Sequence, residues 1–195
     1  MTQPRDVTQP RMVLLFSGHM IDAPGRAEPR FPADKEPIAA RAIDATLDVL
    51  RPGTQDLAIC GGACGGDLLF AEAALARGVP LEVCLPFDEA QFLAASVDFA
   101  GGNWRDRYFA VTRHPHTVRL IASEVIGPLG DGEDPYERNN LWMLARARRF
   151  GDERVQFGCL WNGAGGDGPG GTRHMVEQIE RSGGTVHWLD TRKLW

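Results

Sequence analysis

The chain has 195 residues, of which 43% are hydrophobic and 24% are charged. A chain of this size and apolar content can bury the core of one α/β domain, which excludes an intrinsically disordered protein. Its net charge of -5 gives no general attraction to DNA, RNA or anionic lipid, because binding to these polyanions depends on clustered Lys and Arg. We therefore predict a single domain over residues 1–195 with a flexible arm at 1–11, and expect neither nucleic acid nor membrane as a partner.

Hydropathy and cysteine usage indicate a cytoplasmic protein. No apolar run approaches the ~20 residues that span a bilayer, and the first ten residues are too polar for the core of a signal peptide. Cys60, Cys64, Cys84 and Cys159 lie in or beside apolar segments, as buried thiols do in a reducing compartment. The C-x3-C pair has no second His or Cys pair near it, so no metal site is predicted.

The first half of the chain alternates short apolar runs with longer helical patterns. The runs 12–16 and 56–60 predict strands that are buried on both faces. A helix at 38–50 follows a proline-rich loop, and a helix at 68–77 follows a glycine-rich loop. Next comes a predicted strand at 80–85, after which Asp88 occupies the N-cap position of a helix that runs to about Val97.

The second half repeats this alternation after an irregular stretch at 99–115, which Gly101 and Gly102 interrupt. The pattern then predicts, in order, a short strand within 118–126, a helix at 136–149, a strand at 155–161, a helix at 173–182 and a strand at 186–189. Alternating strands and helices are typical of βαβ units. We therefore predict a three-layer Rossmann-like α/β sandwich with a mostly parallel central sheet and helices on both faces.

Three segments with unusual residues follow predicted strands: 17–22, 61–67 and 162–172. In an open parallel sheet, ligands bind beyond the carboxyl ends of the strands. Glycines there allow close backbone approach, and the next helix presents N–H groups, which together suit a phosphate. One glycine loop alone is equally consistent with a tight turn, but two at the same sheet edge favour a ligand pocket. Neither G-x-G-x-x-G nor G-x-x-x-x-G-K-[ST] occurs, which disfavours classical NAD binding and P-loop ATP hydrolysis.

The segments Ser17-Gly18-His19, 61–67 and 166–172 together resemble the SLOG superfamily, over about residues 12–189. This superfamily includes the LOG phosphoribohydrolases, the DprA proteins and nucleotide-sensor domains. The resemblance implies a Rossmann-like sheet that binds a nucleotide or nucleotide derivative, with phosphate at the glycine loop and the base or ribose near 17–19. LOG enzymes carry P-G-G-x-G-T-x-x-E, whereas the matching segment 62–70 has Asp67 but no Thr-x-x-Glu. The chain is therefore more similar to the sensor branch than to the hydrolase branch.

The predicted ligand-binding residues lie at strand ends, in the glycine loops and at the start of the helix 136–149. They are Ser17, Gly18, His19, Gly61, Gly62, Gly65, Gly66, Asp67, Arg138, Asn139, Gly168, Gly170, Gly171 and Thr172. The expected partner is a nucleotide-like small molecule. No cofactor of the protein itself is predicted, and Mg²⁺ is expected only as the companion of a bound nucleotide.

Catalysis is not specified by these residues. Asp67, Glu72 and His19 are the candidates, but Glu72 falls off the Asp67 face of the predicted helix, so a carboxylate pair for acid–base chemistry is not established. One alternative function is cleavage of a nucleotide N-glycosidic bond. Another is an interaction module that dimerises through a Trp104–Tyr108 surface or the helix of Trp142. We expect a homodimer or a larger homo-oligomer.

Overall fold

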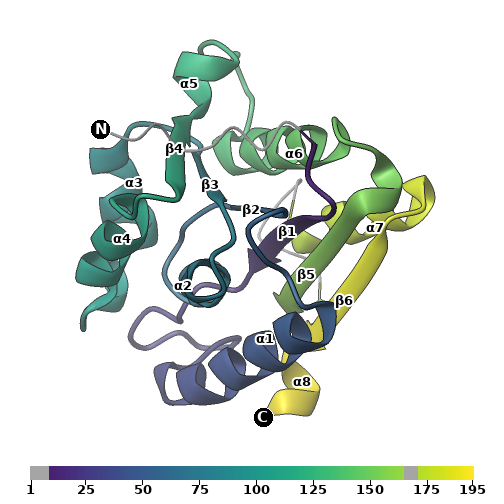
Figure 1. The fold of residues 1–195 in the computed structure, drawn as a ribbon. Coiled ribbons are helices and arrows are strands. Elements are labelled where there is room, and N and C mark those ends of the chain that lie inside the picture. Colours follow the sequence, from purple (N-terminus) through teal and green to yellow (C-terminus); the bar gives the residue numbers. More distant parts are fainter. Residues whose placement is uncertain (1–8, 165–170) are drawn as a thin grey trace.

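The computed structural model describes residues 9–164 and 171–195, which build a six-stranded sheet with helices on both faces (Figure 1). The strands are β1 (Val13–Gly18), β2 (Leu57–Cys60), β3 (Leu81–Leu85), β4 (Thr117–Ile121), β5 (Val155–Trp161) and β6 (Thr185–Asp190). They lie in the order β4-β3-β2-β1-β5-β6, and the pairings within this sheet are all parallel. The observed architecture confirms the predicted Rossmann-like sandwich.

The helices cover the sheet in two layers (Figure 1). They are α1 (Glu36–Leu50), α2 (Gly66–Ala76), α3 (Glu89–Ser96), α4 (Trp104–Thr112), α5 (Ala122–Val125), α6 (Pro135–Arg148), α7 (Thr172–Ser182) and α8 (Thr191–Leu194). Short 3-10 turns precede α1, follow α3 and precede β5. Helices α1 and α2 pack on one face, whereas α6 and α7 pack on the other.

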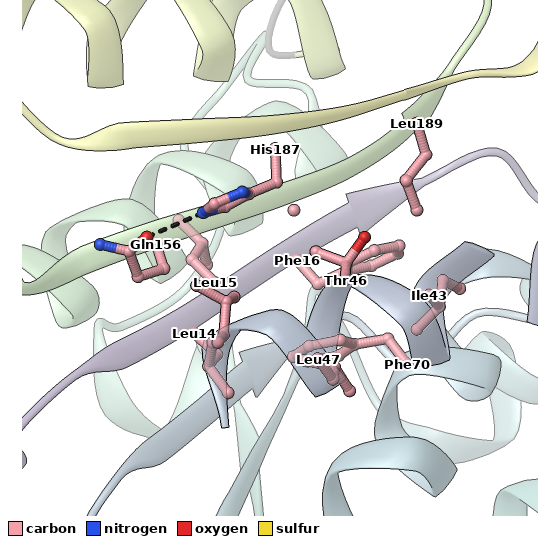
Figure 2. A pocket seen from close by; sticks show the side chains of 12 residues that line it. Leu14, Leu15, Phe16, Ile43, Thr46, Leu47, Phe70, Gln156, His187 and Leu189 are labelled. Carbon is pink, nitrogen blue, oxygen red and sulfur yellow. Dashed lines mark hydrogen bonds between the residues drawn. The ribbon is translucent and has the colours of Figure 1, made fainter. Parts of the chain in front are cut away.

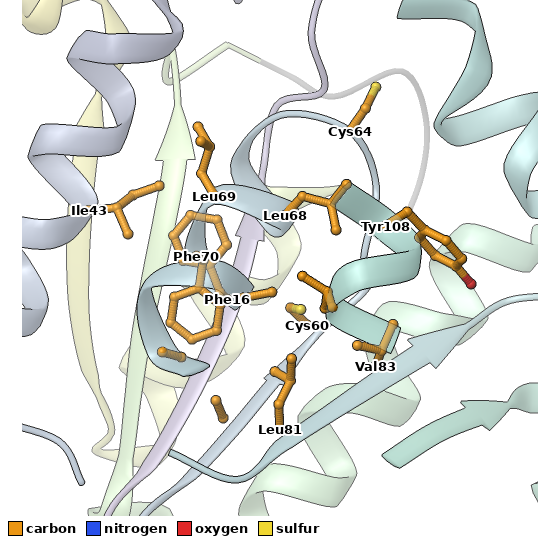
Figure 3. Close-up of a cluster of buried hydrophobic side chains, with 14 of the residues drawn as sticks. Phe16, Ile43, Cys60, Cys64, Leu68, Leu69, Phe70, Leu81, Val83 and Tyr108 are labelled. Atoms are coloured by element: carbon orange, nitrogen blue, oxygen red, sulfur yellow. The ribbon is translucent and has the colours of Figure 1, made fainter. Parts of the chain in front are cut away.

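Alternate residues of β1 supply both layers of the core. Leu14 and Phe16 join the cluster under α1 and α2, and Val13 and Leu15 join the cluster under α6 and α7. Figure 3 shows the first cluster, in which the rings of Phe16 and Phe70 stack with their centroids 4.7 Å apart. A strand that is buried on both faces must be apolar throughout, which is why an unbroken apolar run marked it in the sequence.

Several local predictions are confirmed, and one predicted strand is shorter than expected. Asp88 caps α3, where its Oδ1 accepts the N–H of Gln91 at 3.0 Å. All four cysteines are buried and unpaired. The strand within 118–126 ends at Ile121 and gives way to the short helix α5. Among the described residues, no helix is long and apolar enough to cross a membrane.

The irregular stretch 99–115 contains helix α4, and this corrects the predicted interaction surface. Trp104 is 4% exposed and Tyr108 is fully buried, so their side chains belong to the core. Trp142, on α6, is likewise buried. None of these three aromatic side chains is available to a partner. The helix was missed because its buried face is short and its other positions mix charged residues with Phe109 and Ala110.

The order of the strands in the sheet reverses beside β1, and the candidate site lies at this point. From β1 the chain builds outward through β2, β3 and β4, and then crosses back through α6 to place β5 on the other side of β1. Such a switch point opens a crevice at the carboxyl ends of the two central strands, because the loops that follow them turn to opposite faces. Here those ends are Gly18 and Trp161.

Candidate functional site

A cleft of about 190 Å³ occupies this crevice. It is lined by residues from the ends of β1, β2, β3 and β5, from the starts of α2, α6 and α7, from the loop before α1 and from α3. They are Ser17, Gly18, His19, Met20, Arg30, Gly61, Ala63, Asp67, Pro86, Phe92, Tyr136, Asn139, Asn140, Trp161, Gly171 and Thr172. In the sheet order these four strands are neighbours, and three inter-strand spacings make about 14 Å. The cleft is therefore long enough for a ligand with two chemically different ends.

The structure gathers most of the predicted ligand-binding residues around this cleft. Those that line it are Ser17, Gly18, His19, Gly61, Asp67, Asn139, Gly171 and Thr172. Those that do not are Gly62, Gly65, Gly66 and Arg138. Gly168 and Gly170 lie outside the described residues. The lining residues that the sequence did not single out include Arg30, Phe92, Tyr136 and Trp161.

The carboxylate of Asp67 turns inward and occupies the glycine loop. Its Oδ1 accepts the N–H of Gly18 at 3.2 Å, and its Oδ2 accepts the N–H of Ala63 at 3.4 Å. A Cβ added to Gly61 would lie 2.8 Å from the same Oδ2. Burial raises the pKa of Asp67 to about 7, although these backbone N–H groups favour the carboxylate. A phosphate bound by this loop would have to displace the protein's own acid, so phosphate binding there stays a prediction.

Gly65 and Gly66 serve backbone packing. The N–H of Gly66 donates to the carbonyl of His19 at 3.1 Å, and the N–H of Ile21 donates to the carbonyl of Cys64 at 3.2 Å. Gly65 has φ +101°, and a Cβ there would lie 2.8 Å from the backbone of both His19 and Ile21. These glycines let the loop after β2 lie directly against the loop after β1, a use of glycine that needs no ligand.

His19 fastens the end of β1 to the end of β5. It is 9% exposed, and its Nε2 accepts the N–H of Asn162 at 3.2 Å. Burial, with the charge of Arg30 as the next cause, lowers the pKa of His19 to about 4. The imidazole is therefore neutral at pH 7 and acts as a hydrogen-bond acceptor, which does not suit general-acid catalysis by this candidate residue.

Arg138 and Asn139 are neighbours near the start of α6, but their side chains have different surroundings. The side chain of Asn139 is 4% exposed, and its Nδ2 donates to the carbonyl of Cys84, at the end of β3, at 2.9 Å. Its Oδ1 is buried and has no hydrogen-bond partner within residues 9–164 and 171–195. Arg138 instead donates to the carbonyls of Ile126 and Gly127 and holds the loop that precedes the helix.

The opposite end of the cleft is formed by the start of α7. The hydroxyl oxygens of Ser17 and Thr172 lie 3.4 Å apart, which brings the end of β1 against the first turn of the helix. No acidic side chain occupies that first turn. The positive end of an 11-residue helix therefore faces this end of the cleft without a carboxylate of its own turn to neutralise it.

Glu72 lies away from the cleft and pairs with Arg107. Its two carboxylate oxygens accept from Nε and Nη2 of Arg107 at 2.7 Å and 2.6 Å. Arg107 also pairs with Glu36 and lies 4.0 Å from the ring centroid of Trp104. Glu72 is thus an ion-pair partner on α2 and forms no catalytic pair with Asp67. Within the described part of the chain, no group of three His, Cys, Asp or Glu side chains could hold a metal ion.

A second, much smaller cavity lies between α1 and the sheet (Figure 2). It measures about 20 Å³ and is lined mainly by apolar side chains, among them Leu14, Phe16 and Ile43. His187 and Gln156, joined by a hydrogen bond of 2.7 Å, stand at its border. A cavity of this size holds about one water molecule, so it is a packing defect of the core.

Comparison with known proteins identifies the class of fold. No protein-family model matches the sequence, and no curated protein is detectably similar to it. Among solved structures, the chain is similar to DNA processing protein A (DprA) from Streptococcus pneumoniae, with 15% identity and a TM-score of 0.50 over 93% of this chain and 50% of DprA. It also matches TM1055, with 14% identity and a TM-score of 0.41 over 91% of both chains.

The likeness to DprA concerns the fold. This chain is a Rossmann-like domain with the fold seen in DprA, and that confirms the fold implied by the resemblance to the SLOG superfamily. It spans half the length of that DprA chain.

Proposed function

We propose that this domain binds a nucleotide or nucleotide derivative in the switch-point cleft and acts as a sensor of that ligand. The observation that carries the proposal is the buried Oδ1 of Asn139, which lacks a donor among the described residues. The Cys84 carbonyl can only accept, so the amide nitrogen of Asn139 must face it and the oxygen must face elsewhere. A buried acceptor without a partner is costly, and a ligand that brings an N–H donor into the cleft would remove that cost.

The two ends of the cleft favour a ligand with a heterocycle at one end and an anion at the other. Pro86, Phe92 and Tyr136 line the cleft together with Asn139 and provide apolar and aromatic surface for a base. Ser17, Thr172 and the start of α7 provide hydroxyl groups and helix N–H groups for a phosphate. In this arrangement the base donates to Asn139, and the phosphate lies toward β5. Mg²⁺ would enter only with the nucleotide.

Thermal unfolding with and without nucleotides tests this proposal. Saturating AMP is expected to raise the Tm of the wild type by a few degrees, since a ligand at a hundred times its Kd adds about 2.7 kcal/mol of stability. Purine riboside 5′-monophosphate, which lacks the 6-amino donor, is expected to raise it less. Asn139→Ala is expected to reduce the shift with AMP by at least half, because the acceptor for the base is lost.

Asn103→Ala is the matched control, since Asn103 is exposed and does not line the cleft. It is expected to keep the full shift. If no nucleoside mono-, di- or triphosphate, cyclic nucleotide or ADP-ribose changes the Tm of the wild type, nucleotide binding is wrong. If Asn139→Ala and the wild type respond equally, the base does not contact Asn139.

Cleavage of the N-glycosidic bond remains the second candidate, because the buried Asp67 lines the cleft with its pKa raised to about 7. A carboxyl group with such a pKa can serve as a general acid near neutrality. Each nucleotide that stabilises the protein is therefore incubated with it and analysed for free base. Release of base that Asp67→Asn abolishes would make the protein a hydrolase, and stabilisation without base release supports the sensor.

DNA processing is stated for DprA, and we do not propose it for this chain. The net charge of -5 supplies no general affinity for DNA, so we propose a small-molecule ligand. We also propose a homo-oligomer, which size-exclusion chromatography with light scattering would test.

A further inference from the structure

The loop between β1 and α1 holds Arg30 at the cleft by its backbone. Asp22 Oδ2 accepts the N–H groups of Arg30 and Phe31, both at 2.9 Å, and the N–H of Asp22 donates to the carbonyl of Phe31 at 2.9 Å. Phe31 is fully buried, and its ring stacks on Trp195 with the centroids 5.4 Å apart. The backbone at position 30 is thus anchored on both sides, although it lies in a loop.

Arg30 and His19 both line the cleft. The positive charge of Arg30 acts on the imidazole of His19 and is the second cause of the lowered pKa of that group. The other charged groups that act on the pKa of His19 are Asp22 and Arg26. These two form an ion pair, in which Nε of Arg26 lies 3.6 Å from Oδ1 of Asp22. Asp22 Oδ2 is already engaged by two backbone N–H groups. Among the described residues, the main charges acting on His19 are thus two cations and one carboxylate, and of the two cations Arg30 is the one that lines the cleft.

We propose that Arg30 is a specificity-determining residue that binds an anionic group of the ligand and so selects a phosphorylated ligand over its neutral counterpart. This inference rests on the proposed function, since it concerns the same cleft. Guanidinium suits the task because its planar N–H groups bind two oxygens of a phosphate at once and stay charged at every physiological pH. An anchored backbone also lowers the entropy lost when the side chain is ordered by the ligand.

Binding of AMP and adenosine to the wild type and to Arg30→Gln, measured by calorimetry, tests the assignment. The wild type is expected to bind AMP at least tenfold more tightly than adenosine. Arg30→Gln is expected to lose at least tenfold in AMP affinity while its adenosine affinity stays within twofold. Arg26→Gln is the matched control: it removes a cation from the same loop, but Arg26 does not line the cleft, so AMP affinity is expected to stay within about threefold of the wild type.

An NMR titration of the His19 imidazole gives a second readout that a merely structural role would not move. Arg30→Gln is expected to raise the pKa of His19 in the free protein, because a nearby positive charge is removed. AMP is expected to raise this pKa in the wild type and to change it less in Arg30→Gln, since the phosphate would offset the charge of Arg30. Thermal unfolding of the free variants shows whether the fold is kept.

The outcomes separate the two proposals. If Arg30→Gln binds AMP as tightly as the wild type does, the role of Arg30 is wrong and nucleotide binding stands. If no nucleotide binds the wild type but pyrophosphate does, and Arg30→Gln abolishes pyrophosphate binding, the anion role stands and the nucleotide is wrong. If neither AMP nor pyrophosphate binds the wild type, both proposals are overturned.

Discussion

Gly65→Ala is expected to lower the free energy of unfolding by about 4 kcal/mol or to prevent folding altogether. Gly65 has φ +101° and ψ -128°, a backbone conformation that residues with a side chain rarely adopt. The added Cβ would also lie 2.8 Å from the carbonyl oxygen of His19 and from the amide nitrogen of Ile21. Both neighbours are backbone atoms in hydrogen bonds, so neither can move aside without breaking the contact between the two loops.

Urea denaturation of Gly65→Ala beside Gly101→Ala provides the measurement. Gly101 also has a positive φ, +66°, but a Cβ there would meet nothing within 4 Å. Only backbone strain acts at position 101, where φ +66° and ψ -151° form a conformation that residues with a side chain rarely adopt, and it costs about 1–3 kcal/mol. Equal unfolding midpoints for the two variants would show that the loop after β2 does not pack against residues 19–21 as described. The same argument makes Gly65 unsuitable for testing ligand binding, because its substitution acts on the fold first.

Asp67→Asn is expected to gain stability relative to the wild type by about 4 kcal/mol as the pH rises from 4 to 8. The folded protein raises the pKa of Asp67 to about 7 from the ordinary 3.8, because the carboxyl group is buried. Between these two values the folded state holds a proton that the unfolded state releases, so the wild type loses stability as the pH rises through this window. Asparagine does not titrate, so the free energy of unfolding of the variant does not fall with pH in this way.

The difference between the two proteins is measured by urea unfolding at pH 4, 5, 6, 7 and 8. His19 has the opposite linkage: its pKa is lowered to about 4, so it reduces stability as the pH falls below its ordinary value. That contribution is common to both proteins and largely cancels in the difference. Asp106→Asn, on the exposed side of α4, is the control for the substitution itself. If the difference for Asp67→Asn stays flat across this range, Asp67 is not a buried acid.

Asp67 also shows what the sequence of the loop could not predict, namely the direction of its side chain. The glycines and the acid at 61–67 were correctly placed between a strand and a helix, at the carboxyl edge of the sheet. A local pattern cannot say whether the acid points out toward a ligand or in toward the loop. The inward direction depends on the amide of Gly18, which comes from another strand. The burial of Trp104 and the pairing of Glu72 with Arg107 were missed for the same reason, since each requires the contact between α2 and α4.

The sequence by itself determined the class of the fold and much of the list of site residues. Apolar runs that are buried on both faces, glycine stops and the cap at Asp88 are properties of neighbouring residues, and they identified the order of the strands and of the longer helices other than α4. Only the tertiary structure decided which of those residues meet. Asn139 contacts Cys84 across 55 positions, and Arg30 reaches the cleft from a loop with no distinctive pattern. These contacts follow from the strand order β4-β3-β2-β1-β5-β6, which is set by packing between distant segments and is not encoded in any local periodicity.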